Sequence, residues 1–68
     1  MAAAGFPSWF KRVREGKKIS QTKAALALEL SSPTISRWES GMLPRAEHLP
    51  RICKWAPIAP EKLLRLMH

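Results

Sequence analysis

The stretch that decides the fold runs from Ser20 to Gly41 and reads SQTKAALALELSSPTISRWESG. Its first half is rich in Ala and Leu, which favour a helix, and Ser20 is a residue type preferred at a helix N-cap. Its second half begins with another candidate cap, Ser31, and ends at Gly41, a residue type that commonly stops a helix. We therefore predict two short helices separated by a turn of about three residues, 29–31.

The apolar residues of this stretch lie at helical spacing. Ala24, Ala25 and Leu28 share one face of the first helix, and their small size lets another helix approach closely. Ile35 and Trp38 form an i, i+3 pair that anchors the second helix. The opposite face of that helix carries small polar residues and an arginine. This layout is typical of a helix-turn-helix, whose second helix presents side chains to base edges.

The flanking segments extend the helical pattern in both directions. Ser8 can cap a first helix that runs to about Glu15. Pro50 is expected in the first turn of a fourth helix ending near Trp55, and Pro60 opens a fifth short helix. No segment shows the alternation of a β-strand. We predict an all-α domain of five helices over residues 6–68, preceded by a flexible N-terminus at residues 1–5.

Size and charge restrict the class of protein. The chain has 68 residues, enough for one small domain. Twelve Lys and Arg against five Asp and Glu give a net charge of +7, which indicates a polyanionic partner. Charge alone does not choose between nucleic acid and an anionic membrane surface.

Other features of the sequence point away from several classes. The start has neither a secretory signal nor the run of about 20 apolar residues that a membrane span needs. Cys53 is the only cysteine, and His48 and His68 are far apart, so we expect no disulfide and no metal site. Since no nucleophile–base pair or phosphate-binding glycine loop is present, we expect no enzyme and no cofactor. The expected location is the cytoplasm.

The central stretch resembles a known family. Ser20-Gln21, Ala25, Leu28, Ser31 and the run TISRWESG at residues 34–41 are similar to the Cro/phage-repressor (Xre-like) helix-turn-helix family. The resemblance extends from Phe6 to Leu64, nearly the whole chain. It implies the compact five-helix fold of lambda-repressor-like domains and a role as a DNA-binding transcription regulator.

The resemblance also implies roles for individual residues. Base-reading positions are Ser32, Pro33, Ser36 and Arg37, and DNA-backbone positions are Gln21, Lys23, Ser31, Thr34 and Arg45. Arg14 and Glu39 match a structural ion pair between the first and third helices. Independently of the family, Arg37 is the only side chain of the third helix able to make a bidentate contact with guanine.

Some residues depart from the family pattern, and one of them lies in the turn of the motif. Glu29 stands where a glycine is usual in the turn. A glutamate resists the left-handed backbone conformation at a cost of about 1 kcal/mol. We therefore expect this turn to be shaped differently.

The resemblance further implies a repressor that binds an inverted-repeat operator as a homodimer, in a phage or other mobile element. The expected dimer surface contains Ile58, Leu63, Leu64 and Met67. No small-molecule ligand and no membrane partner are expected. One other class stays open, an antitoxin-type protein that binds both DNA and a protein partner. Trp9, Phe10, Lys11 and Arg12 have the composition of a membrane-active basic peptide, but the pattern continues into five terminated helices, which argues against that class.

Overall fold

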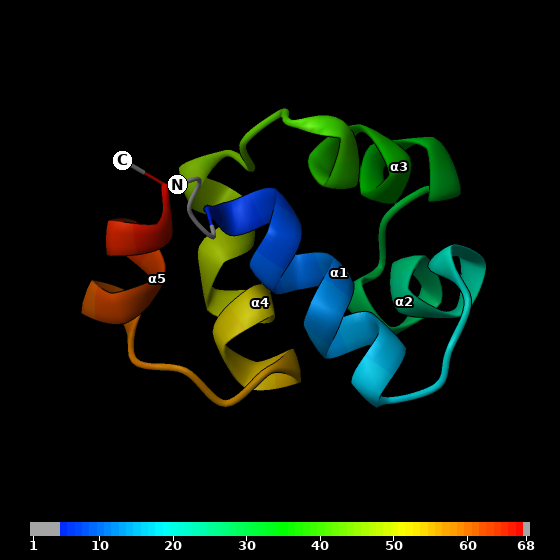
Figure 1. Cartoon of the computed structure of the whole chain (residues 1–68), viewed down its shortest axis with the longest axis horizontal. Coiled ribbons are helices and arrows are strands. Elements are labelled where there is room, and N and C mark those ends of the chain that lie inside the picture. The colour runs from blue at the N-terminus through cyan, green and yellow to red at the C-terminus, as the bar shows by residue number, and fades with distance from the viewer. Residues whose placement is uncertain (1–4, 68) are drawn as a thin grey trace.

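The computed structural model describes residues 5–67, which form five α-helices and one 3-10 helix (Figure 1). These elements are α1 (Phe6–Gly16), α2 (Gln21–Leu28), α3 (Ser32–Ser40), the 3-10 helix η1 (Ala46–His48), α4 (Leu49–Trp55) and α5 (Pro60–Leu66). The all-α prediction is confirmed. The flexible N-terminus expected at residues 1–5 lies, apart from Gly5, outside the described residues.

The first helix begins earlier than expected. Gly5 is its N-cap, and the Gly5 carbonyl accepts a hydrogen bond from the Trp9 N–H at 3.0 Å. Pro7 fits the first turn because the N–H that proline lacks has no partner there. The prediction of Ser8 as the cap is therefore wrong, and Ser8 is an exposed residue inside α1.

The two helices of the central motif have the cap residues that the sequence predicts, Ser20, Ser31 and Gly41. Ser20 caps α2, with its Oγ accepting from the Lys23 N–H at 3.1 Å. Ser31 occupies the N-cap position of α3, but its hydroxyl pairs with Thr34 Oγ1 at 2.9 Å instead of with a backbone N–H. Gly41 ends α3 with φ +128°, a conformation that L side chains rarely adopt.

The turn between α2 and α3 keeps the left-handed conformation in spite of its glutamate. Glu29 has φ +60° and ψ +42°, and the next residue, Leu30, donates to the Ala25 carbonyl at 2.8 Å. Arg51 of α4 supports the turn by donating from Nη1 to the Leu28 carbonyl at 3.3 Å. The expectation of a different shape is thus wrong, since Glu29 adopts the conformation that a glycine would supply.

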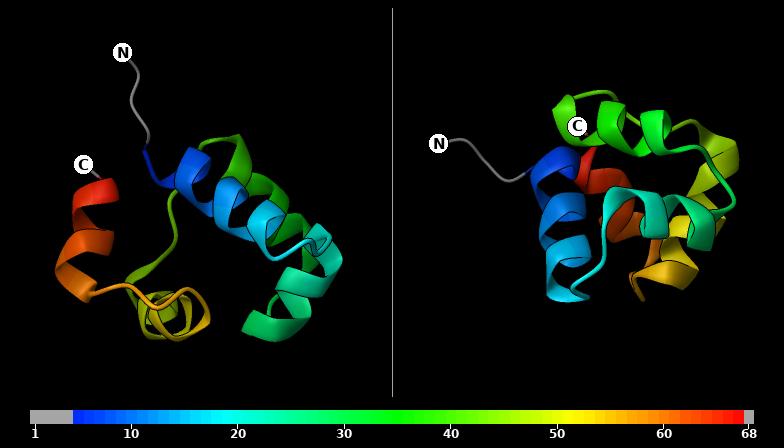
Figure 2. Two further views of the ribbon diagram at one scale, coloured as in Figure 1. Left: turned by 60° about the horizontal axis from the view of Figure 1, so that its bottom comes forward. Right: turned by 90° about the vertical axis from the view of Figure 1, so that its right-hand side faces the viewer.

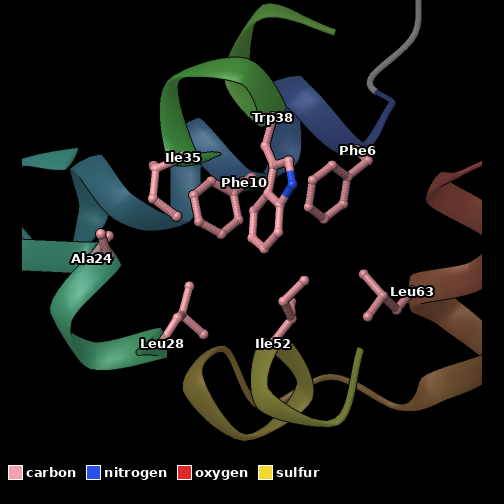
Figure 3. Packing of buried hydrophobic residues seen from close by; sticks show 9 residues of the cluster. Phe6, Phe10, Ala24, Leu28, Ile35, Trp38, Ile52 and Leu63 are labelled. Atoms are coloured by element: carbon pink, nitrogen blue, oxygen red, sulfur yellow. The ribbon is translucent and has the colours of Figure 1, made fainter. Parts of the chain in front are cut away.

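The core lies between α3 on one side and α4 on the other, as Figure 3 shows. Trp38 of α3 lies between the rings of Phe6 and Phe10, at centroid distances of 5.8 and 5.5 Å. The fully enclosed side chains are Phe6, Phe10, Leu28, Ile35, Ile52 and Leu63. Burial of each contributes about 1.5–3 kcal/mol to folding. These six residues come from all five α-helices, so each α-helix is anchored in this one cluster.

The helices pack in two groups around that core. α2 and α3 pack against each other, and α1 packs along α3 (Figure 2). α5 packs on α4 and on α1, so that α1 begins close to the end of α5 (Figure 1). Over residues 5–67, no helix is long and apolar enough to cross a membrane.

Candidate nucleic-acid interface

The third helix has two different faces. Ile35 and Trp38 are 0% and 2% exposed and point into the core. Pro33, Ser36 and Arg37 are exposed on the other side of the helix. A rigid helix with a buried inner face and a free polar outer face can enter a DNA major groove without unfolding any part of the domain.

The fourth predicted base-reading residue is placed differently. Ser32 is only half-exposed, and its Oγ donates to Thr22 Oγ1 of α2 at 3.1 Å. This bond joins the first turns of the two motif helices. Thr22 was missed by sequence reasoning, because nothing in the local pattern shows which hydroxyl of α2 faces α3.

The predicted backbone-contact residues lie at the N-terminal ends of α2 and α3 and in the loop after α3. Lys23 and Ser31 are exposed, whereas Thr34 is half-buried. Arg45 is exposed directly before η1. An N-terminal helix end carries a partial positive charge, so these positions favour nearby phosphate.

A shallow pocket of about 240 Å³ brings three of the predicted residues together. Its walls include Thr34, Arg37 and Arg45, although Arg45 comes from a separate loop. The remaining lining residues are Trp38, Met42, Leu43 and His48. The structure therefore joins a candidate base-reading arginine and a candidate phosphate-binding arginine on one continuous surface.

A partly buried polar network connects α1, α2 and α3 behind this surface. Arg14 Nε donates to Glu39 Oε2 at 2.6 Å, and Arg14 Nη2 donates to Glu39 Oε1 at 3.1 Å. The side chains of Arg14 and Glu39 are 13% and 6% exposed. Gln21 adds a third bond, from its Nε2 to Glu39 Oε1 at 3.1 Å. Arg14 also donates from Nη1 to the Ile19 carbonyl at 2.9 Å, so the network holds the loop before α2 as well.

The network changes the pKa values of both charged partners. Burial acts to raise the pKa of Glu39, but the hydrogen bonds from Arg14 and Gln21, together with the charges of Arg14 and Lys11, outweigh burial and lower that pKa. The hydrogen bond to Glu39 raises the pKa of Arg14 against the opposing effect of burial. Both groups therefore stay charged near neutral pH, and the pair stabilises the position of α3.

One residue expected at a dimer surface is not on the surface. Leu63 is 0% exposed and belongs to the core, so its prediction as an interface residue is wrong. Leu64, its neighbour, is 45% exposed. Ile58 and Met67 are partly buried and pack against the core from outside.

No metal-binding constellation appears in the described part of the chain: residues 5–67 contain no group of three or more His, Cys, Asp and Glu side chains able to hold an ion. Apart from the Pro33 ring, the candidate site consists of hydroxyl, amide, ammonium and guanidinium groups. Such groups bind phosphates and base edges by hydrogen bonds and charge.

The fold and this surface together define a helix-turn-helix DNA-binding domain. A family model described as helix-turn-helix matches residues 10–54, from α1 nearly to the end of α4. The chain belongs to this family, in its Cro/phage-repressor (Xre-like) branch. No curated protein and no solved structure matches the chain significantly. Membership of this family makes the chain a DNA-binding transcriptional regulator.

Proposed function

We propose that the chain is a sequence-specific repressor that binds an inverted-repeat operator in double-stranded DNA as a homodimer. It inserts α3 into the major groove and acts in the cytoplasm of a bacterial cell or phage-infected host. The observation that carries this proposal is the division of α3, whose inner residues Ile35 and Trp38 are enclosed while Pro33, Ser36 and Arg37 are exposed. A helix divided in this way is held rigidly enough to discriminate between bases.

Arg37 carries the strongest base recognition in this proposal. It is exposed near the middle of α3, and a bidentate contact from an arginine to guanine O6 and N7 contributes about 1–3 kcal/mol of discrimination. Ser36 adds an adaptable hydroxyl, and the Pro33 ring suits contact with a thymine methyl group. Ser32 contributes less directly than the other three, because its hydroxyl already binds Thr22.

Contacts to the DNA backbone orient the domain in the groove. Lys23, Ser31, Thr34 and Arg45 supply them from positions around α3. Gln21 has one amide hydrogen directed at Glu39 and keeps a second donor for a phosphate. Glu39 thereby orients the amide that meets the DNA backbone.

Dimerisation follows from the small size of one recognition helix, which covers only a few base pairs. We propose that two copies bind half-sites about 34 Å apart, one turn of DNA. The surface that joins them contains Ile58, Leu64 and Met67, of which Leu64 is the most exposed. Leu63 supports this surface from the core.

A selection from random duplex DNA tests the proposal. We expect an enriched inverted repeat, and a salt titration of the best sequence should show affinity falling steeply as salt rises. The Leu64→Lys variant should then bind the full repeat more weakly while binding an isolated half-site as the wild type does. Enrichment of a single unrepeated site would contradict the dimer, and salt-sensitive binding without any enriched sequence would contradict base reading.

A further inference from the structure

A second pocket lies between the end of α2 and the outer side of α4. Its volume is about 410 Å³, and it is lined by Ala27, Glu29, Arg51, Lys54 and Trp55. None of these residues belongs to the candidate DNA surface. In Figure 3, α4 lies across the core from α3, and no residue of α3 lines this pocket.

The charge around this pocket is mostly positive. Arg51 and Lys54 line it, and Lys17, the residue that follows α1, lies beside it with its Nζ 5.4 Å from the centre of the Trp55 ring. Over residues 5–67, Lys17 and Lys54 take part in no ion pair. Two cations and one carboxylate, that of Glu29, therefore line the pocket, and a third cation lies over the ring of Trp55.

Glu29 is the one acidic residue that lines this pocket, and it faces Arg51. Its Oε1 lies 3.6 Å from Arg51 Nη2, with both side chains well exposed. The chain's own carboxylate thus satisfies one of the cations and leaves the other two without an anionic partner. A further carboxylate placed in the pocket would meet Lys54 and Lys17.

Trp55 gives the pocket a rigid apolar wall. Its ring stacks on Phe10 with a centroid distance of 4.8 Å and an interplanar angle of 27°. Its Nε1–H is enclosed and has no acceptor among the described residues. A wall of this kind suits an aliphatic or aromatic side chain next to an acidic one.

We propose that this pocket is a docking site for an acidic segment of a partner protein, one that alternates carboxylates with apolar residues. Charge complementarity with Lys17, Arg51 and Lys54 attracts the segment, and its apolar residue packs on Trp55. Because no lining residue of the pocket belongs to α3, the site leaves α3 free to bind DNA while the partner is bound.

The experiment uses the full chain and a fluorescein-labelled peptide of about 12 residues made of Asp, Glu and Leu. A matched peptide with Asn and Gln in place of the acids is the control. Fluorescence anisotropy at low salt should show saturable binding of the acidic peptide alone. NMR spectra of the labelled protein should show the largest shifts at the backbone amides of Ala27, Lys54 and Trp55.

Two charge reversals separate this site from general attraction to a basic protein. Lys54→Glu should weaken peptide binding by at least about tenfold, whereas Lys62→Glu on α5, with the same change in net charge, should weaken it by less than about twofold. Prior addition of duplex DNA should leave the peptide affinity unchanged. Thermal melting of both variants verifies that the domain is folded.

Three results would overturn the proposal. The first is an absence of peptide binding. The second is an equal loss of peptide affinity in the Lys54→Glu and Lys62→Glu variants. The third is a Lys54→Glu variant that binds random duplex DNA as weakly as Arg45→Ala does, since the cluster would then be a DNA-backbone contact. Loss of operator selection with intact peptide binding would contradict the proposed function alone.

Discussion

Glu39 of α3 and Arg14 of α1 are joined side by side, with two nitrogens of one guanidinium bonded to the two oxygens of one carboxylate. Both side chains are almost enclosed. A bidentate pair of this kind fixes direction as well as distance. It therefore sets how α3 lies across α1, and with it the orientation of the proposed DNA-reading face.

Replacing Glu39 by Gln should destabilise the domain by about 3 kcal/mol, because Arg14 would be left enclosed without its counter-charge. Urea denaturation followed by circular dichroism measures this loss. Glu47→Gln is the matched control, since the Glu47 side chain is 68% exposed and its removal should change stability by less than about 0.5 kcal/mol. Equal midpoints for the two variants would show that the pair does not stabilise the fold.

Stability should fall in acid because of the same carboxylate. The folded-state pKa of Glu39 lies below its unfolded value of about 4.3, so the unfolded chain binds more protons as the pH drops. The contribution is fully present above that unfolded pKa and is lost as the pH falls through the folded pKa. Denaturation of the wild type and of Glu39→Gln between neutral pH and pH about 2 measures the difference between their free energies of unfolding. This difference should become smaller as the pH falls. A constant difference across this range would contradict the lowered pKa.

The conformation of Glu29 predicts an ordering of two variants. Glu29→Gly should be more stable than Glu29→Ala by about 1 kcal/mol, because only glycine adopts φ +60° without a steric cost. Both variants lose the carboxylate that faces Arg51, so the comparison isolates the backbone. Thermal unfolding of the pair is the measurement, and an alanine variant as stable as the glycine variant would show that the turn has relaxed.

Arg37→Ala should reduce affinity for the selected operator and relax the preference at one base pair of each half-site. The expected loss is about 1–3 kcal/mol per half-site. Arg65→Ala on α5 removes the same charge far from α3 along the chain and serves as the control. Repeating the selection with each variant measures the preference, and an unchanged consensus for Arg37→Ala would remove this residue from base reading.

Arg45→Ala should behave differently from Arg37→Ala. It should weaken binding to all sequences alike, and the slope of log affinity against log salt should become shallower by about 0.9 for each phosphate that the arginine no longer neutralises. Salt titrations on operator and random duplex DNA measure the slope. A change in base preference with an unchanged slope would reverse the roles proposed for the two arginines.

The helix boundaries show how much of the fold could be predicted from local chemistry. Ser20 and Gly41 mark ends that depend on one side chain or one backbone conformation, and the structure confirms both. The prediction for Ser8 failed because Pro7 at the preceding residue already suits a first turn, and the helix could start after Gly5. Ser8 and Ser20 have the same propensity to cap a helix, and their neighbours decide that only Ser20 does so.

Burial was harder to predict in the short helix α5 than in α3. Ile35 and Trp38 follow helical spacing and are enclosed. Leu63 and Leu64 are adjacent leucines on a short helix, and only packing against α1 and α4 decides that Leu63 points inward. The η1 turn was not predicted for a similar reason, since so short a segment leaves no periodic pattern.

In the candidate site, the sequence motif predicted which residues are exposed but did not predict the hydrogen bonds between different helices. The bond from Ser32 to Thr22 and the support of the turn by Arg51 both join residues of different helices. Sequence spacing along one helix carries no information about such pairs. The shared pocket of Arg37 and Arg45 likewise arises only when the loop after α3 folds back.

The two faces of α3 have a consequence for how such a domain evolves. The inner face contains Ile35 and Trp38, which are buried in the core, and Glu39, which is bonded to Arg14. Substitutions at these positions would destabilise the fold. Ser36 and Arg37 are exposed, and their side chains have no such role, so substitutions there leave the core unchanged. Under the proposed function, a lineage can therefore acquire a new operator by a few changes on the exposed face of α3 while the core stays the same.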